Sequence, residues 1–187
     1  MAIPILPTFS AGEILTSSVM NDVSTLGNYQ GLFHIKTQTI GTAVSSVTVT
    51  GAFSADYDNY LITVSGGVNS LDGNVLDIKF GSTVTGYYFS MIYTSWNNVV
   101  TAAGQANTTK IDYVAQAGTS SLNGFIEVNS PFLTENTTVR ASVSNSTFYG
   151  GTTNGLLRNT TSYTSFILAT SGGTMTGGTI RVYGLRN

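Results

Sequence analysis

The hydrophobic period of this chain changes near residue 31, and this change constrains the fold more than any other feature of the sequence. Before it, apolar residues recur every three or four positions, which is typical of a helix; after it, apolar and polar residues alternate in short runs, which is typical of strands. Residues 60–64 and 76–80 are clear examples, and paired glycines follow several of the runs. The runs are residues 33–39, 47–49, 60–64, 76–80, 87–93, 110–115, 124–128, 138–143, 163–169 and 179–183. About ten such runs with turns between them predict an all-β fold over residues 31–187: an antiparallel, jelly-roll-like β-sandwich.

Two local patterns refine this prediction. Residues 71–74 read Leu-Asp-Gly-Asn, and an Asp-Gly pair suits the positive φ angles of a hairpin turn. Threonine, with 29 of 187 residues, fits a pleated sheet while keeping its outer face polar, whereas charged residues are only 9% of the chain. Few lysines therefore protect the sheet edges, and uncharged edges favour pairing with another chain.

The first ten residues predict an extended arm. Pro4 and Pro7 fix their own φ angles and keep the residues before them out of the helical region. An extended arm has no core of its own, so either its end is frayed or its apolar side chains bury against a neighbouring subunit or the rest of a particle. The side chains expected to anchor it are Ile3, Ile5, Leu6 and Phe9.

Residues 11–30 predict a short amphipathic helix and a linker. Ser10 and Glu13 fit a capping box at its start, and Gly27 fits its end. One apolar stripe runs along the helix and is expected to pack on the β domain or on a sister subunit, with members Leu15, Val19, Val23 and Leu26. Three segments are thus expected: an arm (1–10), a helix with linker (11–30) and a sandwich (31–187).

Composition excludes several classes of function. The chain has no Cys and one His, so disulfides, thiol metal sites and multi-histidine metal sites are excluded, and we expect no cofactor. Seven Lys and Arg residues and a net charge of −2 predict no binding to nucleic acid. No apolar run approaches the ~20 residues of a bilayer span, so no membrane insertion is expected. Residues 1–9 also lack the basic start of a signal peptide.

Catalytic interpretations are weak. His34 falls on the predicted solvent face of a strand, and no G-x-S-x-G motif accompanies it. Asp72 and Asp77 could form a carboxylate pair, but Asp72 has a turn role and Asp77 is expected on the outer face of a strand. Residues 56–59 (Asp-Tyr-Asp-Asn) suit a turn better than a calcium site. We therefore expect a protein that is not an enzyme.

Aromatic residues offer the remaining candidates for ligand contact. Most tyrosines of a sheet pack in a core or an interface. Trp96 lies where a predicted strand ends, and Tyr149 precedes a Gly-Gly pair. These two residues are the ones expected to contact a glycan, if one is bound.

Three short segments resemble bacteriophage virion proteins. Residues 7–16 (PTFSAGEILT), followed by Met20 and Asn21, are similar to the opening of many such proteins. Residues 53–64 (FSADYDNYLITV) resemble a strand entry of phage β-sandwich structural proteins, and residues 177–185 (GGTIRVYGL) resemble their closing strand. The resemblance implies a non-enzymatic protein on the exterior surface of a virion, usually homotrimeric, with the arm and helix as its anchor.

Two roles follow from these expectations. In the first, the chain is a homotrimeric capsid decoration, or cement, protein attached to other virion proteins such as capsid or tail components through its arm and helix. In the second, it is a tail- or head-fibre receptor-binding protein that recognises a host-surface glycan. The absence of a long repetitive shaft favours decoration. An enzyme such as a depolymerase is disfavoured because histidine and clustered acids are scarce.

Overall fold

The computed structural model describes Thr16, residues 31–144 and residues 149–185. Every regular element in this part of the chain is a β-strand. The strands are β1 (Leu32–Thr39), β2 (Ser46–Thr50), β3 (Asn59–Ser65), β4 (Val68–Asn69), β5 (Asn74–Phe80), β6 (Tyr87–Ser95), β7 (Val100–Thr108), β8 (Ile111–Ala117), β9 (Leu122–Asn129), β10 (Thr137–Ser144), β11 (Tyr149–Leu157), β12 (Ser165–Thr170), β13 (Met175–Thr176) and β14 (Thr179–Leu185). The predicted arm and helix lie outside the described residues, Thr16 excepted, so both stay predictions.

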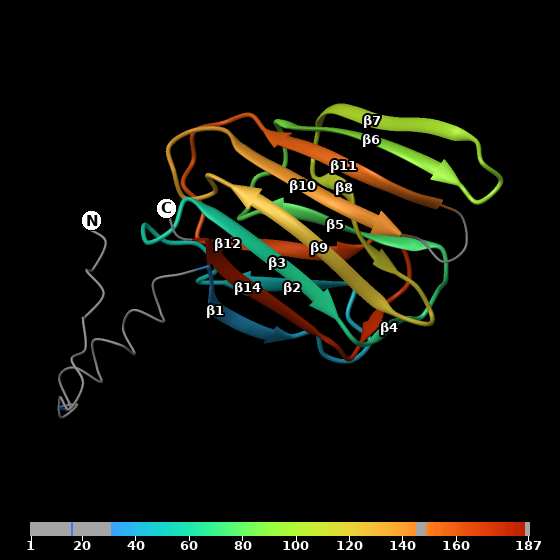
Figure 1. Cartoon of the computed structure of the whole chain (residues 1–187), viewed down its shortest axis with the longest axis horizontal. Coiled ribbons are helices and arrows are strands. Elements are labelled where there is room, and N and C mark those ends of the chain that lie inside the picture. Colours follow the sequence, from blue (N-terminus) through green and yellow to red (C-terminus); the bar gives the residue numbers. More distant parts are fainter. Residues whose placement is uncertain (1–15, 17–30, 145–148, 186–187) are drawn as a thin grey trace, which may run out of the picture.

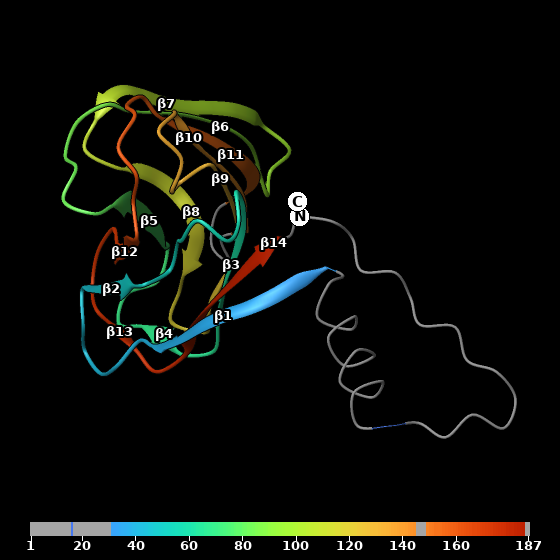
Figure 2. The same cartoon turned by 90° about the vertical axis from the view of Figure 1, so that its left-hand side faces the viewer.

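Twelve strands form one antiparallel sheet that folds into two layers. The first layer has the order β1-β14-β3-β9-β10-β11-β6-β7, and the second has the order β2-β12-β5-β8. The short β8–β9 hairpin connects them, and β4 and β13 form a separate small ladder. Figure 1 views the first layer face-on, and Figure 2, turned by 90°, shows β2, β12 and β5 on one side and β1, β14 and β3 on the other. The all-β, antiparallel, sandwich-like architecture expected from the alternating pattern is therefore confirmed.

Eight of these strands pair in a nested order. β1 pairs with β14, β2 with β12, β3 with β9 and β5 with β8. Among the eight, the first strand thus pairs with the last, the second with the second-last, and so on inward. The β6–β7 and β10–β11 hairpins are insertions into this pattern, and they extend the first layer beyond β9.

The main core fills the space between the layers. Alternation turns Tyr60 and Ile62 of β3, and Ile78 and Phe80 of β5, inward, and all four are fully buried. Buried tyrosine hydroxyls in this core have hydrogen-bond partners: the Tyr60 hydroxyl, for example, donates to the Ser54 carbonyl oxygen at 2.8 Å. The core therefore combines apolar burial with paired polar atoms, as a stable sandwich requires.

The predicted hairpin at residues 71–74 is wrong, although its turn is present. Gly73 has a φ of +74°, as an Asp-Gly turn requires, but β4 and β5 do not pair with each other. β4 pairs with β13 instead, and the Asn69 side-chain amide donates to the carbonyl oxygens of Leu71 and Gly172. These contacts hold the start of the turn against the segment after β12, so β5 is free to enter the second layer.

Candidate functional site

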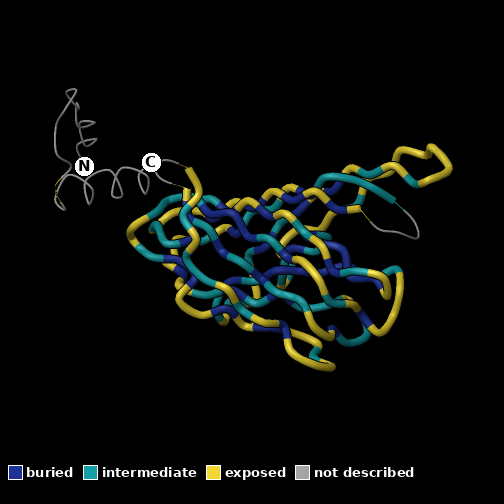
Figure 3. Tube along the Cα trace, turned by 60° about the horizontal axis from the view of Figure 1, so that its bottom comes forward, coloured by how far each residue is buried: buried dark blue, intermediate teal, exposed yellow. Residues whose placement is uncertain are grey.

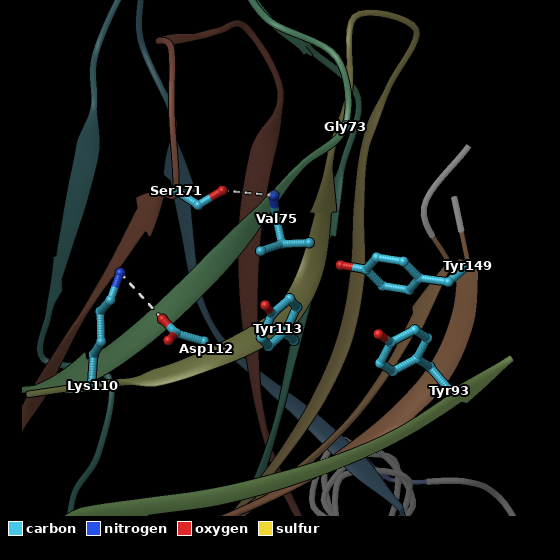
Figure 4. A pocket seen from close by; sticks show the side chains of 8 residues that line it. All are labelled: Gly73, Val75, Tyr93, Lys110, Asp112, Tyr113, Tyr149 and Ser171. Carbon is cyan, nitrogen blue, oxygen red and sulfur yellow. Dashed lines mark hydrogen bonds and ion pairs between the residues drawn. The ribbon is translucent and has the colours of Figure 1, made fainter. Parts of the chain in front are cut away.

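A hollow of about 370 Å³ lies where the extension of the first layer meets β5 and β8. Tyr93 of β6 and Tyr149 of β11 line it from the first layer (Figure 4). The β8 region contributes Lys110, Asp112 and Tyr113, while Gly73, Val75 and Ser171 complete the lining. Its volume falls within the usual range of small-molecule sites.

The three tyrosine rings form a connected cluster. The ring centroids of Tyr93 and Tyr149 are 4.9 Å apart, and those of Tyr113 and Tyr149 are 6.2 Å apart at an interplanar angle of 67°. A second, smaller hydrophobic core lies beneath them, formed by the buried side chains of Val75, Met91 and Val143. This packing fixes the rings, which are all partly exposed, before any ligand arrives.

Tyr113 owes its position to an irregularity in β8. The register between β5 and β8 shifts between Leu76 and Ile78, and Tyr113 has a φ of +61°. A positive φ is unfavourable for a bulky side chain, and a bulge of this kind re-aims the residue that carries it. The buried hydroxyl of Thr153, on β11, donates to the Tyr113 carbonyl oxygen at 2.7 Å. The neighbouring strand therefore helps to hold the strained backbone in place.

On the side of the hollow formed by Tyr93 and Tyr149, a glycine in β11 allows β6 to pack closely against β11. A Cβ atom at Gly151 would lie only 2.6 Å from the Cβ of Tyr93, so any side chain there would displace that residue. Gly151 is paired with Tyr93 across the β6–β11 ladder. Gly151 is thus a packing requirement of the Tyr93 wall, and the Gly-Gly pair at 150–151 lies within β11 and is not a turn between strands.

A charged cluster borders the tyrosines. The Lys110 ammonium lies 2.5 Å from a carboxylate oxygen of Asp77 and 3.2 Å from one of Asp112. Burial raises the pKa of Asp77, and the hydrogen bond and charge of Lys110 offset part of that rise. Burial alone would lower the pKa of Lys110, but the hydrogen bond and charge of Asp77, together with Asp112, outweigh it and raise the pKa. Lys110 therefore stays charged and is already engaged by two acids.

The tyrosine hydroxyls complete the chemistry of the hollow. Burial, followed by the neighbouring Tyr113 and Tyr93, raises the pKa of Tyr149 well above its ordinary value. Its hydroxyl accordingly stays protonated, and a protonated hydroxyl both donates and accepts hydrogen bonds. The hollow thus offers aromatic faces and neutral hydroxyl groups beside a balanced ion cluster. This combination suits an uncharged molecule with many hydroxyl groups and an apolar ring face.

The two predicted ligand-contacting residues lie on opposite faces of the first layer. Tyr149 lines the hollow, on the inner face. Gly150 follows Tyr149 in β11, so a side chain at position 150 would point to the outer face. The Trp96 ring lies over that position: a Cβ atom added to Gly150 would contact it. Trp96 is 59% exposed there. The structure therefore separates Trp96 from Tyr149, and it groups Tyr149 with Tyr93 and Tyr113.

The other residues singled out by the sequence have structural surroundings. His34 is exposed, hydrogen-bonds with the Thr37 hydroxyl at 2.8 Å and contacts the Tyr183 ring. Asp77 was expected on an outer face, but it is 4% exposed, because Lys110 lies across it. Asp56 accepts a hydrogen bond from the Ser54 hydroxyl within its turn. The anchoring candidates all lie outside the described residues: Ile3, Ile5, Leu6, Phe9, Leu15, Val19, Val23 and Leu26.

Sequence reasoning did not identify Lys110, Asp112 or Tyr113 as site residues. All three fall in or beside a predicted strand, and the sequence carries no signal that the backbone bulges there.

The described residues include no group of three His, Asp or Glu side chains that could hold a metal ion. The same part of the chain contains no helix of the length and apolarity needed to span a bilayer.

Comparison with known proteins leaves the chain without a family. No protein-family model matches it, and no curated protein matches it significantly.

Proposed function

We propose that this chain is a non-enzymatic surface protein of a bacteriophage virion, built on a jelly roll. A jelly roll is a long hairpin of eight strands wrapped into two sheets, and the nested pairing of β1, β2, β3 and β5 with β14, β12, β9 and β8 supports that assignment. Jelly rolls are common in capsid and lectin domains. The three resembling segments point to the same class, with a homotrimer as the expected assembly.

Among the two roles expected for such a protein, the hollow favours recognition of a host-surface glycan. The carrying observation is the cluster of Tyr93, Tyr113 and Tyr149, held partly exposed over a small core. A pyranose ring has an apolar face that packs on an aromatic ring and hydroxyl groups that bond to tyrosine hydroxyls and carboxylates. Asp112 lies at the border of the hollow as a carboxylate acceptor.

The charge of the hollow selects the class of sugar. Lys110 is the one cation among the eight lining residues, and Asp77 and Asp112 already neutralise it. An acidic sugar would meet no unpaired cation there and would be repelled by the second carboxylate. Neutral hexoses are therefore the proposed ligands, in preference to sialic or uronic acids.

A glycan array probed with the full chain tests this role. We expect binding to neutral oligosaccharides, and at least tenfold weaker binding by Tyr149→Ala and Tyr93→Ala, equivalent to about 1.4 kcal/mol. Tyr149→Phe serves as a milder variant, because it keeps the ring and removes only the hydroxyl. Tyr88→Ala is the matched control, because Tyr88 lies on the same strand as Tyr93 but alternates to the opposite face. Binding that survives in both hollow variants would refute the assignment.

Capsid decoration is the second candidate, and one surface favours it. A groove of about 430 Å³ on the outer face of the β1, β14, β3 and β9 region is lined by Leu32, Leu61, Phe125 and Leu185 among others. Phe125 is 52% exposed in it. Leu32 begins β1, directly after the predicted arm and helix. The groove also lies toward the opposite end of the first layer from β6 and β7, so we propose that this end faces the particle.

Decoration has its own test. Deletion of residues 1–10 should abolish attachment to the particle while leaving the far-ultraviolet circular dichroism of the β domain unchanged. An arm that buries about four large apolar side chains would contribute several kcal/mol, at ~1.5–3 each before ordering costs. Retained binding of the truncated chain to particles would contradict this role without affecting the glycan proposal.

A further inference from the structure

The two edges of the first layer are protected differently. At one edge, β1 carries Lys36, whose ammonium donates to the Thr50 carbonyl oxygen of β2 at 2.6 Å. This contact joins the two layers and places a charge at that end. At the other edge, β7 pairs with β6 alone, so one row of its backbone amides and carbonyls has no strand partner within the described residues.

Over residues 100–105, the β7 edge lacks the devices that normally keep edge strands apart. Residues 91–109 contain no charged residue and no proline. Seven of the nine residues of β7 are exposed. Its one irregularity lies near Asn107, at the far end, so residues 100–105 form a regular ladder with β6. A regular, uncharged edge is a template for a further strand.

Exposed apolar side chains lie beside the same edge. Ile92 and Val100 are 67% and 71% exposed, and alternation places both on the outer face of the layer. Trp96 and Val99, at the end of the hairpin, are also exposed. Figure 3 shows this hairpin as a largely exposed projection from the sandwich. Several exposed apolar side chains on one hairpin are typical of an interaction surface.

We propose that β7 is the docking strand for a second copy of this chain, which adds a strand to the first layer at this edge. Strand addition supplies main-chain hydrogen bonds, and it would join the Ile92–Val100 patches of two copies into one covered surface. The absence of charge favours a second copy as the occupant, because identical uncharged strands meet no like-charge repulsion and offer no charge pattern to a foreign partner. This inference is independent of the hollow, whose residues face the other way.

Sedimentation velocity of the full chain from 1 to 100 µM tests the proposal. The wild-type chain should associate, and Ala102→Lys should weaken association at least tenfold, because Ala102 is exposed at the centre of the edge opposite Ile92. Thr48→Lys is the matched control, because it adds the same charge to an exposed position of β2, an edge strand of the second layer. Circular dichroism reports whether each variant is folded.

Hydrogen exchange supplies a second readout that does not require a variant. Amides of residues 100–105 should exchange more slowly at 100 µM than at 1 µM, while those of β2 should not change. An even number of copies with slowed exchange in β7 indicates β7 against β7, and a trimer with slowed exchange in β7 indicates β7 against β1, the other edge of the first layer; both support the docking role. A trimer without slowed exchange in β7 would contradict it. A monomeric wild-type chain at 100 µM would overturn it. So would association that Ala102→Lys leaves intact with no change of exchange in β7.

Discussion

Replacement of Lys110 by methionine tests the electrostatics of the hollow border most sharply. The substitution keeps the length of the side chain and removes the ammonium that lies 2.5 Å from Asp77. Asp77 cannot turn to water, because its side chain is only 6% exposed. The variant therefore leaves a buried carboxylate without its counter-charge.

The expected loss of stability depends on how deeply Asp77 and Lys110 are each buried. Removing one partner of a fully buried ion pair costs about 3–5 kcal/mol. The Lys110 side chain is 35% exposed, so solvent screens the interaction and the expected loss at pH 7 is smaller, about 1–3 kcal/mol. Lys79→Met is the control, because Lys79 is the weakest of the charges that act on Asp77. It should change stability by less than about 0.5 kcal/mol.

The pH dependence gives the sign of the effect. Burial raises the pKa of Asp77 above its ordinary value of 3.8, so the stability linked to this carboxyl is complete below that value and is lost as the pH rises through the folded-state pKa. Without Lys110 the pKa of Asp77 rises further and the loss at pH 7 grows. Urea unfolding followed by circular dichroism should thus show a Lys110→Met deficit at pH 7 that shrinks at pH 4. An unchanged stability at pH 7, or a deficit equal at both pH values, would refute this reasoning.

Three further predictions follow from named contacts. The Phe80 amide donates to the Tyr87 hydroxyl at 2.7 Å in the core, and Tyr87→Phe removes that acceptor. The free energy of unfolding should fall by about 1–3 kcal/mol. Tyr88→Phe is the control and should change it little. Burial raises the pKa of Tyr87 and Tyr149 well above 10.0, so near that pH these two side chains ionise only in the unfolded state. The free energy of unfolding should therefore fall as the pH rises past 10.0, and it should fall less steeply in Tyr87→Phe. Gly151→Ala forces a Cβ against Tyr93 and should lower the thermal midpoint, while Gly150→Ala meets only the Trp96 ring edge at 3.4 Å and should be tolerated. Thermal unfolding of the two glycine variants, each compared with wild type, checks the last of these.

The sequence predicted the strands that carry a strong alternation and missed those that do not. β3 and β5 bury one or both faces in the main core, so their apolar periodicity is plain. β7 was missed because it is an exposed edge strand with small and polar residues throughout. β11 was missed because its glycines, which allow Tyr93 and Ile111 to approach, erase the apolar pattern. β7 and β11 form strands because neighbouring strands pair with them, and such pairing cannot be recognised from a short stretch of sequence.

The hollow was only partly predictable, for a related reason. Tyr149 could be named because it stands beside a Gly-Gly pair, but its neighbours come from β6 and β8, far along the chain. Tyr113 enters the site through a bulge that Thr153 of β11 supports. Trp96 was grouped with Tyr149 because both lie near strand ends. Tyr149 pairs with Ser95, however, so Trp96, one residue further along, points to the other face of the layer.

A crystal structure of the full chain with the neutral oligosaccharide that binds best on the array tests the central proposal most directly. We expect a sugar ring packed against Tyr93 or Tyr149 in the hollow, with a hydroxyl group bonded to Asp112 or the Tyr113 hydroxyl. A sugar seated on the outer face beside Trp96, with the hollow unchanged, would contradict it.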